Sequence, residues 1–314
     1  MISYNPIIQE LHKESAYQVD VLRLDLIDVE ISGNKWFKLK NNLEKAISQN
    51  KKSIITFGGA YSNHIAATAA ACKKFNLKCI GVIRGEEKEE LNDTLKTAQK
   101  NGMEFYFVDR ETYKQKDTIE FKNNLAKTFG EHYLIPEGGN NEEGVSGCMD
   151  ILKKEWNYDY VFCACGTATT FAGILTSAKD QNKIIGISVL KGENNLPAEA
   201  EVLLDKISLN SSKMKILGEE ALKKDFIEDS CILNSYAFKG YAKKNTELLN
   251  FKTEFENKFE IPLDHIYTTK LFYAVFDLIK RKKLISDSKI LVVHSGGLQG
   301  NEAFEKRYHL TPNL

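Results

Sequence analysis

The feature that most constrains the fold is a regular alternation of short apolar runs with helical patterns along nearly the whole chain. The apolar runs are rich in β-branched residues, as buried strands are, and the segments between them have helical lengths. Strands are expected at 21–27, 53–57, 78–83, 103–108, 133–135, 160–164, 184–190 and 290–294. Helices are expected at 63–75, 92–100, 111–128, 141–155, 169–181, 194–224, 251–259 and 270–282. This alternation predicts an α/β protein with parallel sheets and right-handed crossovers.

Length and charge limit the function classes. A chain of 314 residues is long enough for two domains, each with its own core. Lys+Arg and Asp+Glu both number 43, so the formal net charge is zero and neither nucleic acid nor an anionic membrane is an expected partner. The first residues, M-I-S-Y-N-P-I-I-Q-E, do not resemble a signal peptide, and no apolar stretch approaches the ~18 residues of a membrane span.

The six cysteines have no regular spacing and lie mostly inside apolar runs. They are expected to be reduced, buried thiols of a cytoplasmic protein. The pair Cys163 and Cys165 is not a C-x-x-C motif and has no second Cys or His pair nearby in sequence, so no metal site is predicted.

A lysine-bearing turn lies at 31–39, I-S-G-N-K-W-F-K-L. Lys35 and Lys38 are three residues apart and project to the same side of the first turn of a helix. Two cations at the start of a helix are electrostatically unfavourable for it. The pair makes sense if an anion binds there or if one amine is neutral; the alternative is a solvated lysine surface.

Two loops between a strand and a helix are expected to bind anions. The loop at 57–64, F-G-G-A-Y-S-N-H, presents backbone N–H groups at Ser62, Asn63 and His64 and could hold a carboxylate. The loop at 165–173, C-G-T-A-T-T-F-A-G, brings three hydroxyls and several amides to the positive end of a helix, which predicts a phosphate cup. It is neither a P-loop nor a G-x-G-x-x-G loop. Ordinary helix capping is the alternative for both loops.

An amine-bearing turn, a carboxylate loop and a phosphate cup together describe one kind of ligand. That ligand is a phosphate-bearing aldehyde cofactor joined to a lysine, with a small amino-acid substrate beside it. Pyridoxal 5'-phosphate meets this description with the fewest assumptions.

Six motifs appear in a fixed order: I-S-G-N-K-W-F-K-L-K, G-G-A-Y-S-N-H, C-G-T-A-T-T-F-A-G, G-Y-A, I-Y-T-T-K and H-S-G-G. In this layout the chain resembles the family of 1-aminocyclopropane-1-carboxylate deaminase and D-cysteine desulfhydrase. These are pyridoxal-phosphate enzymes of the tryptophan-synthase-β fold type. The resemblance runs over about residues 23–297 and implies a smaller domain at 38–148 inserted into a larger one formed by 1–37 plus 149–314, in a homodimer.

The resemblance also implies residue roles around the cofactor. Lys35 would carry the cofactor covalently and move the α-proton of the substrate, and Asn63 would bond the 3′-oxygen of the pyridine ring. Lys38 would lie near the phosphate, beside the loop formed by Gly166, Thr167, Ala168, Thr169 and Thr170.

Other roles concern the substrate. Ser62, with Asn63, His64 and the backbone nearby, would take the substrate carboxylate, and Ser62 could also act on the substrate. Tyr241 and Tyr267 would face the reacting carbons. This chain departs from the family pattern at Phe37, Ala242 and Thr269, and from Asn245 on it lacks the usual P-N-E pattern. These differences leave the substrate open.

Two positions near the pyridine ring separate the relatives. In the resemblance, the deaminases carry Glu and Leu where this chain has the hydroxyl-bearing Thr268 and Ser295. This pattern predicts α,β-elimination from D-cysteine, with pyruvate, ammonia and sulfide as products. The alternatives are ring opening of the cyclopropane amino acid, or a non-catalytic module that keeps the two anion-binding loops.

Overall fold

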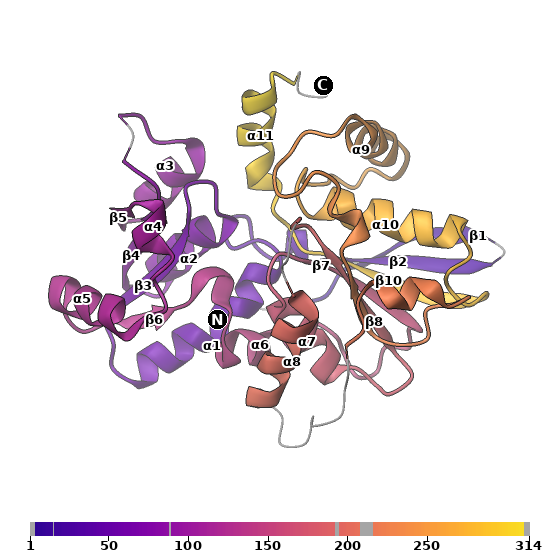
Figure 1. The fold of residues 1–314 in the computed structure, drawn as a ribbon, viewed down its shortest axis with the longest axis horizontal. Coiled ribbons are helices and arrows are strands. Elements are labelled where there is room, and N and C mark those ends of the chain that lie inside the picture. Colours follow the sequence, from indigo (N-terminus) through magenta and orange to yellow (C-terminus); the bar gives the residue numbers. More distant parts are fainter. Residues whose placement is uncertain (1–3, 15, 88, 192–194, 208–215, 311–314) are drawn as a thin grey trace.

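The structure is a computed structural model that describes residues 4–14, 16–87, 89–191, 195–207 and 216–310. It contains two sheets that lie side by side (Figure 1). The larger has the strand order β1-β2-β10-β7-β8-β9 and the smaller β5-β4-β3-β6. Every strand pair in them is parallel except β1 with β2. The expected α/β class with parallel sheets is confirmed.

The strands of the larger sheet come from both ends of the chain. They are β1 (Ile8–Glu14), β2 (Tyr17–Arg23), β7 (Tyr160–Cys165), β8 (Lys183–Ser188), β9 (Cys231–Leu233) and β10 (Ser288–His294). The smaller sheet consists of β3 (Ser53–Gly59), β4 (Lys78–Arg84), β5 (Met103–Val108) and β6 (Tyr133–Ile135). The sequence did not predict β1, which lies at an edge, or β9, which has three residues. The strand expected at 21–27 is wrong in its second half, where η1 (Leu24–Leu26) begins.

Helices cover both sheets. They are α1 (Asn34–Ser48), α2 (Asn63–Lys74), α3 (Asp93–Lys100), α4 (Arg110–Tyr113), α5 (Ile119–Phe129), α6 (Glu142–Cys148), α7 (Thr169–Ser177), α8 (Leu196–Ile207), α9 (Thr246–Phe259), α10 (Thr268–Lys280) and α11 (Asn301–Tyr308). The 3₁₀ turns η2 (Glu137–Gly139), η3 (Glu219–Lys223), η4 (Ser235–Ala237) and η5 (Leu298–Gly300) lie in the connections.

Three expected helices differ from the structure. The helix expected at 111–128 is two helices, because Asp109 caps α4 and Thr118 caps α5 through a hydrogen bond from Phe121 N. The helix expected at 141–155 ends at 148, and its glycines lower its helical propensity. Of the expected 194–224 helix, α8 covers 196–207, and residues 194 and 208–215 lie outside the described residues.

Alternating side chains place one hydrophobic core on each face of the larger sheet. On β7, Tyr160 and Phe162 pack toward α9 and α10, whereas Val161 and Cys163 pack toward α6, α7 and α8. The smaller sheet is arranged similarly: Ile54 of β3 packs toward α1, α2 and α3, and Ile55 packs toward α4 and α5. Burial on both faces is the usual arrangement of parallel sheets.

The smaller sheet is one continuous insertion between β2 and β7. The helices α1 and α6 lie before and after the smaller sheet in the chain and pack closely against each other. A Cβ atom at Gly147 of α6 would lie only 1.9 Å from the carbonyl oxygen of Phe37 of α1. The proposed domain boundaries near 38 and 148 fall in these two helices, and the division remains a prediction. No helix in the described ranges is long and apolar enough to span a membrane. The six cysteines are free and buried.

Candidate active site

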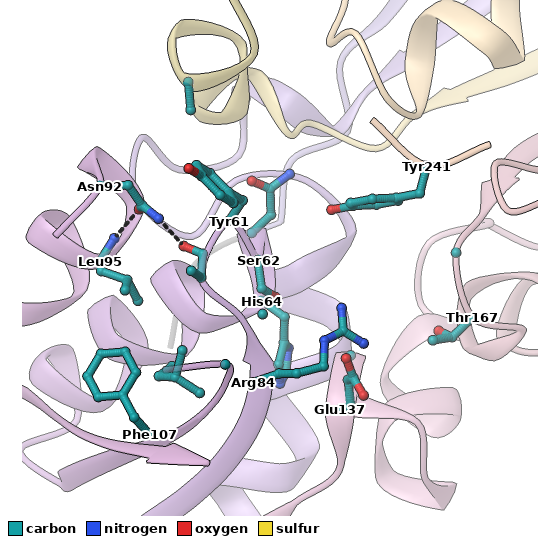
Figure 2. Close-up of a pocket in the computed structure, with 18 of the residues that line it drawn as sticks. Tyr61, Ser62, His64, Arg84, Asn92, Leu95, Phe107, Glu137, Thr167 and Tyr241 are labelled. Carbon is teal, nitrogen blue, oxygen red and sulfur yellow. Dashed lines mark hydrogen bonds between the residues drawn. The ribbon is translucent and has the colours of Figure 1, made fainter. Parts of the chain in front are cut away.

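A cleft of about 1930 Å³ opens where loops from the two sheets meet (Figure 2). Ten of the residues singled out from the sequence line it: Lys35, Lys38, Ser62, Asn63, His64, Gly166, Thr167, Tyr241, Tyr267 and Ser295. The structure places four others behind its wall: Ala168, Thr169, Thr170 and Thr268. Much of the lining lies at the carboxyl ends of parallel strands, where open α/β sheets bind their ligands.

The lysine-bearing turn packs directly on the end of β10. Gly33 has a φ of +71°, and a Cβ atom there would lie 1.8 Å from the carbonyl oxygen of Ser295. The backbone N–H of Asn34 donates to that same oxygen at 3.2 Å. Only glycine permits this approach, which joins two motifs that are 262 residues apart in the chain (33 and 295).

Lys35 is held at the floor of the cleft by its neighbour. Its Nζ donates to Asn34 Oδ1 at 2.7 Å, while Asn34 Nδ2 donates to Thr170 Oγ1 at 2.9 Å. The amine lies 5.8 Å from the centre of the Tyr267 ring. Burial, followed by the Lys38 cation, lowers the pKa of Lys35 to about 7. At pH 7 this amine is therefore only about half protonated, which relieves part of the electrostatic conflict at the helix start.

Lys38 connects α1 with the threonine loop. Its buried Nζ donates to Thr167 Oγ1 at 3.0 Å, and burial lowers the pKa of Lys38. Thr167 Oγ1 lies 3.1 Å from Thr169 Oγ1, which donates to Asn140 Oδ1 at 2.8 Å. The hydroxyls of Thr169 and Thr170 therefore fix neighbouring segments, and Thr167 is the threonine of this loop that faces the cleft.

The loop before α2 contains polar groups that make no hydrogen bond within the described structure. Ser62 stands at the N-cap but makes no side-chain capping bond, so no side chain caps the N–H groups of the first turn. Asn63 Oδ1 and His64 Nδ1 are buried and have no hydrogen-bond partner in the described structure. Buried polar atoms without partners are rare, and a bound ligand is one way to satisfy them.

The His64 ring contacts the smaller sheet. Its Nε2 lies 2.8 Å from Thr56 Oγ1, and that hydroxyl donates its proton to the carbonyl oxygen of Ile135. The ring must therefore donate from Nε2, which leaves Nδ1 as a bare acceptor. Burial, together with the two lysine cations, lowers the pKa of His64 to about 3. A neutral ring with a bare Nδ1 cannot donate to a carboxylate from that atom, so only the backbone N–H of His64 remains for that role.

Two tyrosines form the opposite wall. The rings of Tyr241 and Tyr267 meet edge to face with 6.1 Å between their centres. A Cβ atom at Gly166 would lie 3.0 Å from the Tyr267 ring, so the glycine lets the loop approach it. Burial raises the pKa of both tyrosines, which keeps their hydroxyls protonated at neutral pH. They can donate a proton or a hydrogen bond, and they are poor bases.

Asp264 was not singled out from the sequence. Its buried carboxylate accepts from the backbone N–H groups of Ile266, Tyr267 and Thr268, and from the Thr268 hydroxyl at 2.8 Å. These bonds fix the start of α10 and explain why Thr268 does not line the cleft. An aspartate just ahead of an apolar helical pattern is a capping signal that could have identified it.

Two further charged groups lie beneath the cleft. Lys270 donates to the carbonyl oxygens of Val189, Ala237 and Gly240, and so fixes the segment that precedes Tyr241. In a separate cluster, Asp25 accepts three hydrogen bonds from Arg23 and lies 3.2 Å from Nδ1 of His294, the last residue of β10, which directly precedes Ser295. The sequence offers no local signal for the contacts of Lys270 or for the approach of His294 to Asp25, because these partners are distant in the chain.

Three residues that depart from the family pattern, Phe37, Ala242 and Thr269, can be placed in the structure. Phe37 is buried and packs edge-on against Tyr4, with ring centres 4.8 Å apart. Ala242 has a φ of +50°, a region in which glycine is favoured. Thr269 donates its hydroxyl proton to the carbonyl oxygen of Asp264 at 2.7 Å.

Comparison with known proteins agrees with this geometry. The profile of the family described as "Pyridoxal-phosphate dependent enzyme" matches residues 13–296. The chain belongs to this family. A Pyrococcus furiosus protein named "Putative 1-aminocyclopropane-1-carboxylate deaminase" is 31% identical over 95% of this chain and 89% of its own length. The "Bifunctional D-cysteine desulfhydrase/1-aminocyclopropane-1-carboxylate deaminase, mitochondrial" of Arabidopsis thaliana is 27% identical over 89% of this chain and 72% of its own.

A solved structure shows the same similarity in three dimensions. The crystal structure of an ACC deaminase homologue matches with a TM-score of 0.81 at 28% identity, over 99% of this chain and 95% of that one. The expected family, that of 1-aminocyclopropane-1-carboxylate deaminase and D-cysteine desulfhydrase, is confirmed, and with it pyridoxal phosphate as the cofactor. The residues of the cleft fit that group: a lysine amine with a lowered pKa, a buried Asn63 side chain with an unpartnered oxygen, and a threonine loop at a helix start.

Proposed function

We propose that the chain is a lyase that carries out α,β-elimination on a small amino acid, and that D-cysteine is converted to pyruvate, ammonia and sulfide. One observation carries the choice of reaction. The part of the cleft wall formed by the larger sheet and its loops includes Ser295, and no Asp or Glu beyond residue 137 lines the cleft in the described structure. The buried carboxylate of Asp264 lies behind this wall, engaged by backbone N–H groups and Thr268.

The chemistry of the pyridine nitrogen links that wall to the substrate. A carboxylate beside the nitrogen would favour its protonated form, because an opposite charge stabilises the charged state. A hydroxyl is compatible with a neutral nitrogen, which withdraws electrons less strongly. Weaker withdrawal is adequate when the leaving group on Cβ is good, as a thiolate is, and less adequate for opening a cyclopropane ring. Ser295 therefore favours elimination. The Thr268 hydroxyl donates to Asp264 instead and does not line the cleft.

We assign the cofactor contacts as follows. Lys35 attaches the cofactor, and Asn63 donates to its 3′-oxygen from the side-chain Nδ2. Lys38 and Thr167 bind the phosphate at the start of α7, where backbone N–H groups favour an anion. Bound pyridoxal phosphate supplies an electron sink that stabilises negative charge at Cα of the substrate.

The chain's own groups would then perform the proton transfers. The substrate carboxylate is held by Ser62 and the first N–H groups of α2, and the released Lys35 amine takes the proton from Cα. The Cβ–S bond breaks, its electron pair leaves with sulfur, and a Cα–Cβ double bond forms. Tyr241 or Tyr267, whose hydroxyls stay protonated, can supply the proton that sulfur takes up. Water then converts the unsaturated amine to pyruvate and ammonia.

An assay of the purified holoenzyme against D-cysteine, L-cysteine and 1-aminocyclopropane-1-carboxylate tests this proposal. We expect sulfide and pyruvate in equal amounts from D-cysteine, and little keto acid from the cyclopropane substrate. Lys35→Ala should lose the visible absorbance band of the lysine-bound cofactor and nearly all turnover. Rapid cyclopropane turnover without sulfide from either cysteine enantiomer would reject elimination in favour of the deaminase reaction.

A further inference from the structure

We propose that Arg84 binds a second anionic group of the substrate, carried on the side chain beyond Cβ. The inference rests on the proposed function, because it takes the substrate to be an amino acid whose own carboxylate is held at the start of α2. It defines a substrate class: amino acids whose leaving group on Cβ carries an acidic function such as a carboxylate, sulfonate or phosphate.

Arg84 lies beside the carboxylate loop. It is the last residue of β4 and pairs in register with Gly59, the last residue of β3. Its Nη2 is 3.5 Å from the position that a Cβ atom would take at Gly59. Figure 2 shows the side chain extending from the strand end into the cavity. The guanidinium is therefore part of the cleft wall.

No carboxylate of the described ranges forms an ion pair with Arg84. Its guanidinium stands over the ring of the buried Tyr113, with 5.6 Å from Cζ to the ring centre. By contrast, Lys116, another cation of the cleft, lies 3.4 Å from Asp117 and 3.6 Å from Glu137. An oriented guanidinium without an acidic partner has the donor geometry that binds carboxylate and phosphate in bidentate fashion.

The position of Arg84 argues against a role with the α-carboxylate. A Cβ atom at Gly58 would lie 2.9 Å from Ser62 Oγ, whereas a Cβ atom at Gly59 would lie 3.5 Å from the guanidinium. Successive Cβ atoms of a strand point to opposite faces. The Ser62 hydroxyl and the Arg84 guanidinium therefore flank the end of β3 from opposite sides, and they serve two anionic groups rather than one.

The size of the cleft agrees with a larger substrate. Its volume of about 1930 Å³ exceeds the roughly 300–1,000 Å³ of ordinary small-molecule pockets. Pyridoxal phosphate with a cysteine-sized amino acid would leave part of it free. A longer acidic side chain would occupy that space and reach the end of β4.

Calorimetric binding of unreactive acids to the holoenzyme separates the two anion sites. Propionate offers one carboxylate and succinate offers two, so succinate should bind about tenfold or more tightly, as expected for hydrogen bonds to a charged group. Arg84→Gln should abolish the preference, and Arg84→Lys should retain part of it. Arg110→Gln is the matched control, since Arg110 also lines the cleft but belongs to α4, and it should keep the preference.

A kinetic comparison provides the second readout. The ratio of kcat/KM for S-sulfocysteine to that for β-chloroalanine should fall about tenfold or more in Arg84→Gln and stay unchanged in Arg110→Gln. Absence of turnover with β-chloroalanine would reject the proposed elimination, whereas a retained succinate preference that depends on Arg84 would still support the anion site.

Three results would overturn the assignment of Arg84. The first is equal binding of succinate and propionate by the unsubstituted enzyme. The second is an equal loss of affinity for both acids in Arg84→Gln, which would place this guanidinium on the α-carboxylate. The third is loss of the preference in Arg110→Gln as well, which would indicate a diffuse positive field.

Discussion

At the scale of single residues, Lys35 shows how neighbouring groups set the protonation of one amine. Its folded-state pKa of about 7 lies below the ordinary value of about 10.4. Between these values the unfolded chain binds more protons, so this residue makes the free energy of unfolding rise with pH. From pH 7 to 9 we expect the cofactor-free protein to gain about 1–2 kcal/mol relative to Lys35→Met, measured by urea unfolding. Parallel pH profiles of the two proteins would contradict the lowered pKa.

At the scale of elements, Lys270 of α10 fixes the end of β8 and the segment before Tyr241 through three carbonyl oxygens. Lys270→Met leaves these buried acceptors without their charged donor. We expect it to lower the free energy of unfolding by about 2–4 kcal/mol. The control is Lys114→Met at the end of α4, whose exposed amine pairs with the exposed Glu111 and should cost about 1 kcal/mol or less. Equal losses in chemical denaturation would show that the carbonyl cluster has no special role.

At the scale of the whole molecule, the cleft joins loops from both sheets, so the cofactor should stabilise the complete fold. Pyridoxal phosphate at about 100 times its Kd should add about 2.7 kcal/mol, which raises Tm by several degrees in scanning calorimetry. Pyridoxal, which lacks the phosphate, should raise Tm much less at the same concentration. An equal rise with both compounds would show that the loop at 166–170 does not hold the phosphate.

The sequence determined the local features of this protein. The period of its apolar residues located most strands and helices, and the capping and turn residues located the three loops that line the cleft. The order of the motifs identified the family. These features depend on neighbouring residues, and the spacing of side chains along a strand or helix reports them directly. The edge strand β1 was not predicted, and neither was β9, whose three residues carry little periodic signal.

The tertiary structure alone decided which side chains face the cleft. Gly33 packs against the backbone of Ser295, and Asp264 accepts a hydrogen bond from Thr268. The His64 ring donates from Nε2 to Thr56, which leaves its Nδ1 without a partner in the described structure. The same packing directs Thr169 and Thr170 away from the cleft and brings Arg84 into it. The direction of a side chain follows from the strand register and from the buried polar groups that it must satisfy. Several of those partners, such as Ser295 for Gly33 and Thr170 for Asn34, come from distant parts of the chain, and local sequence patterns carry no record of them.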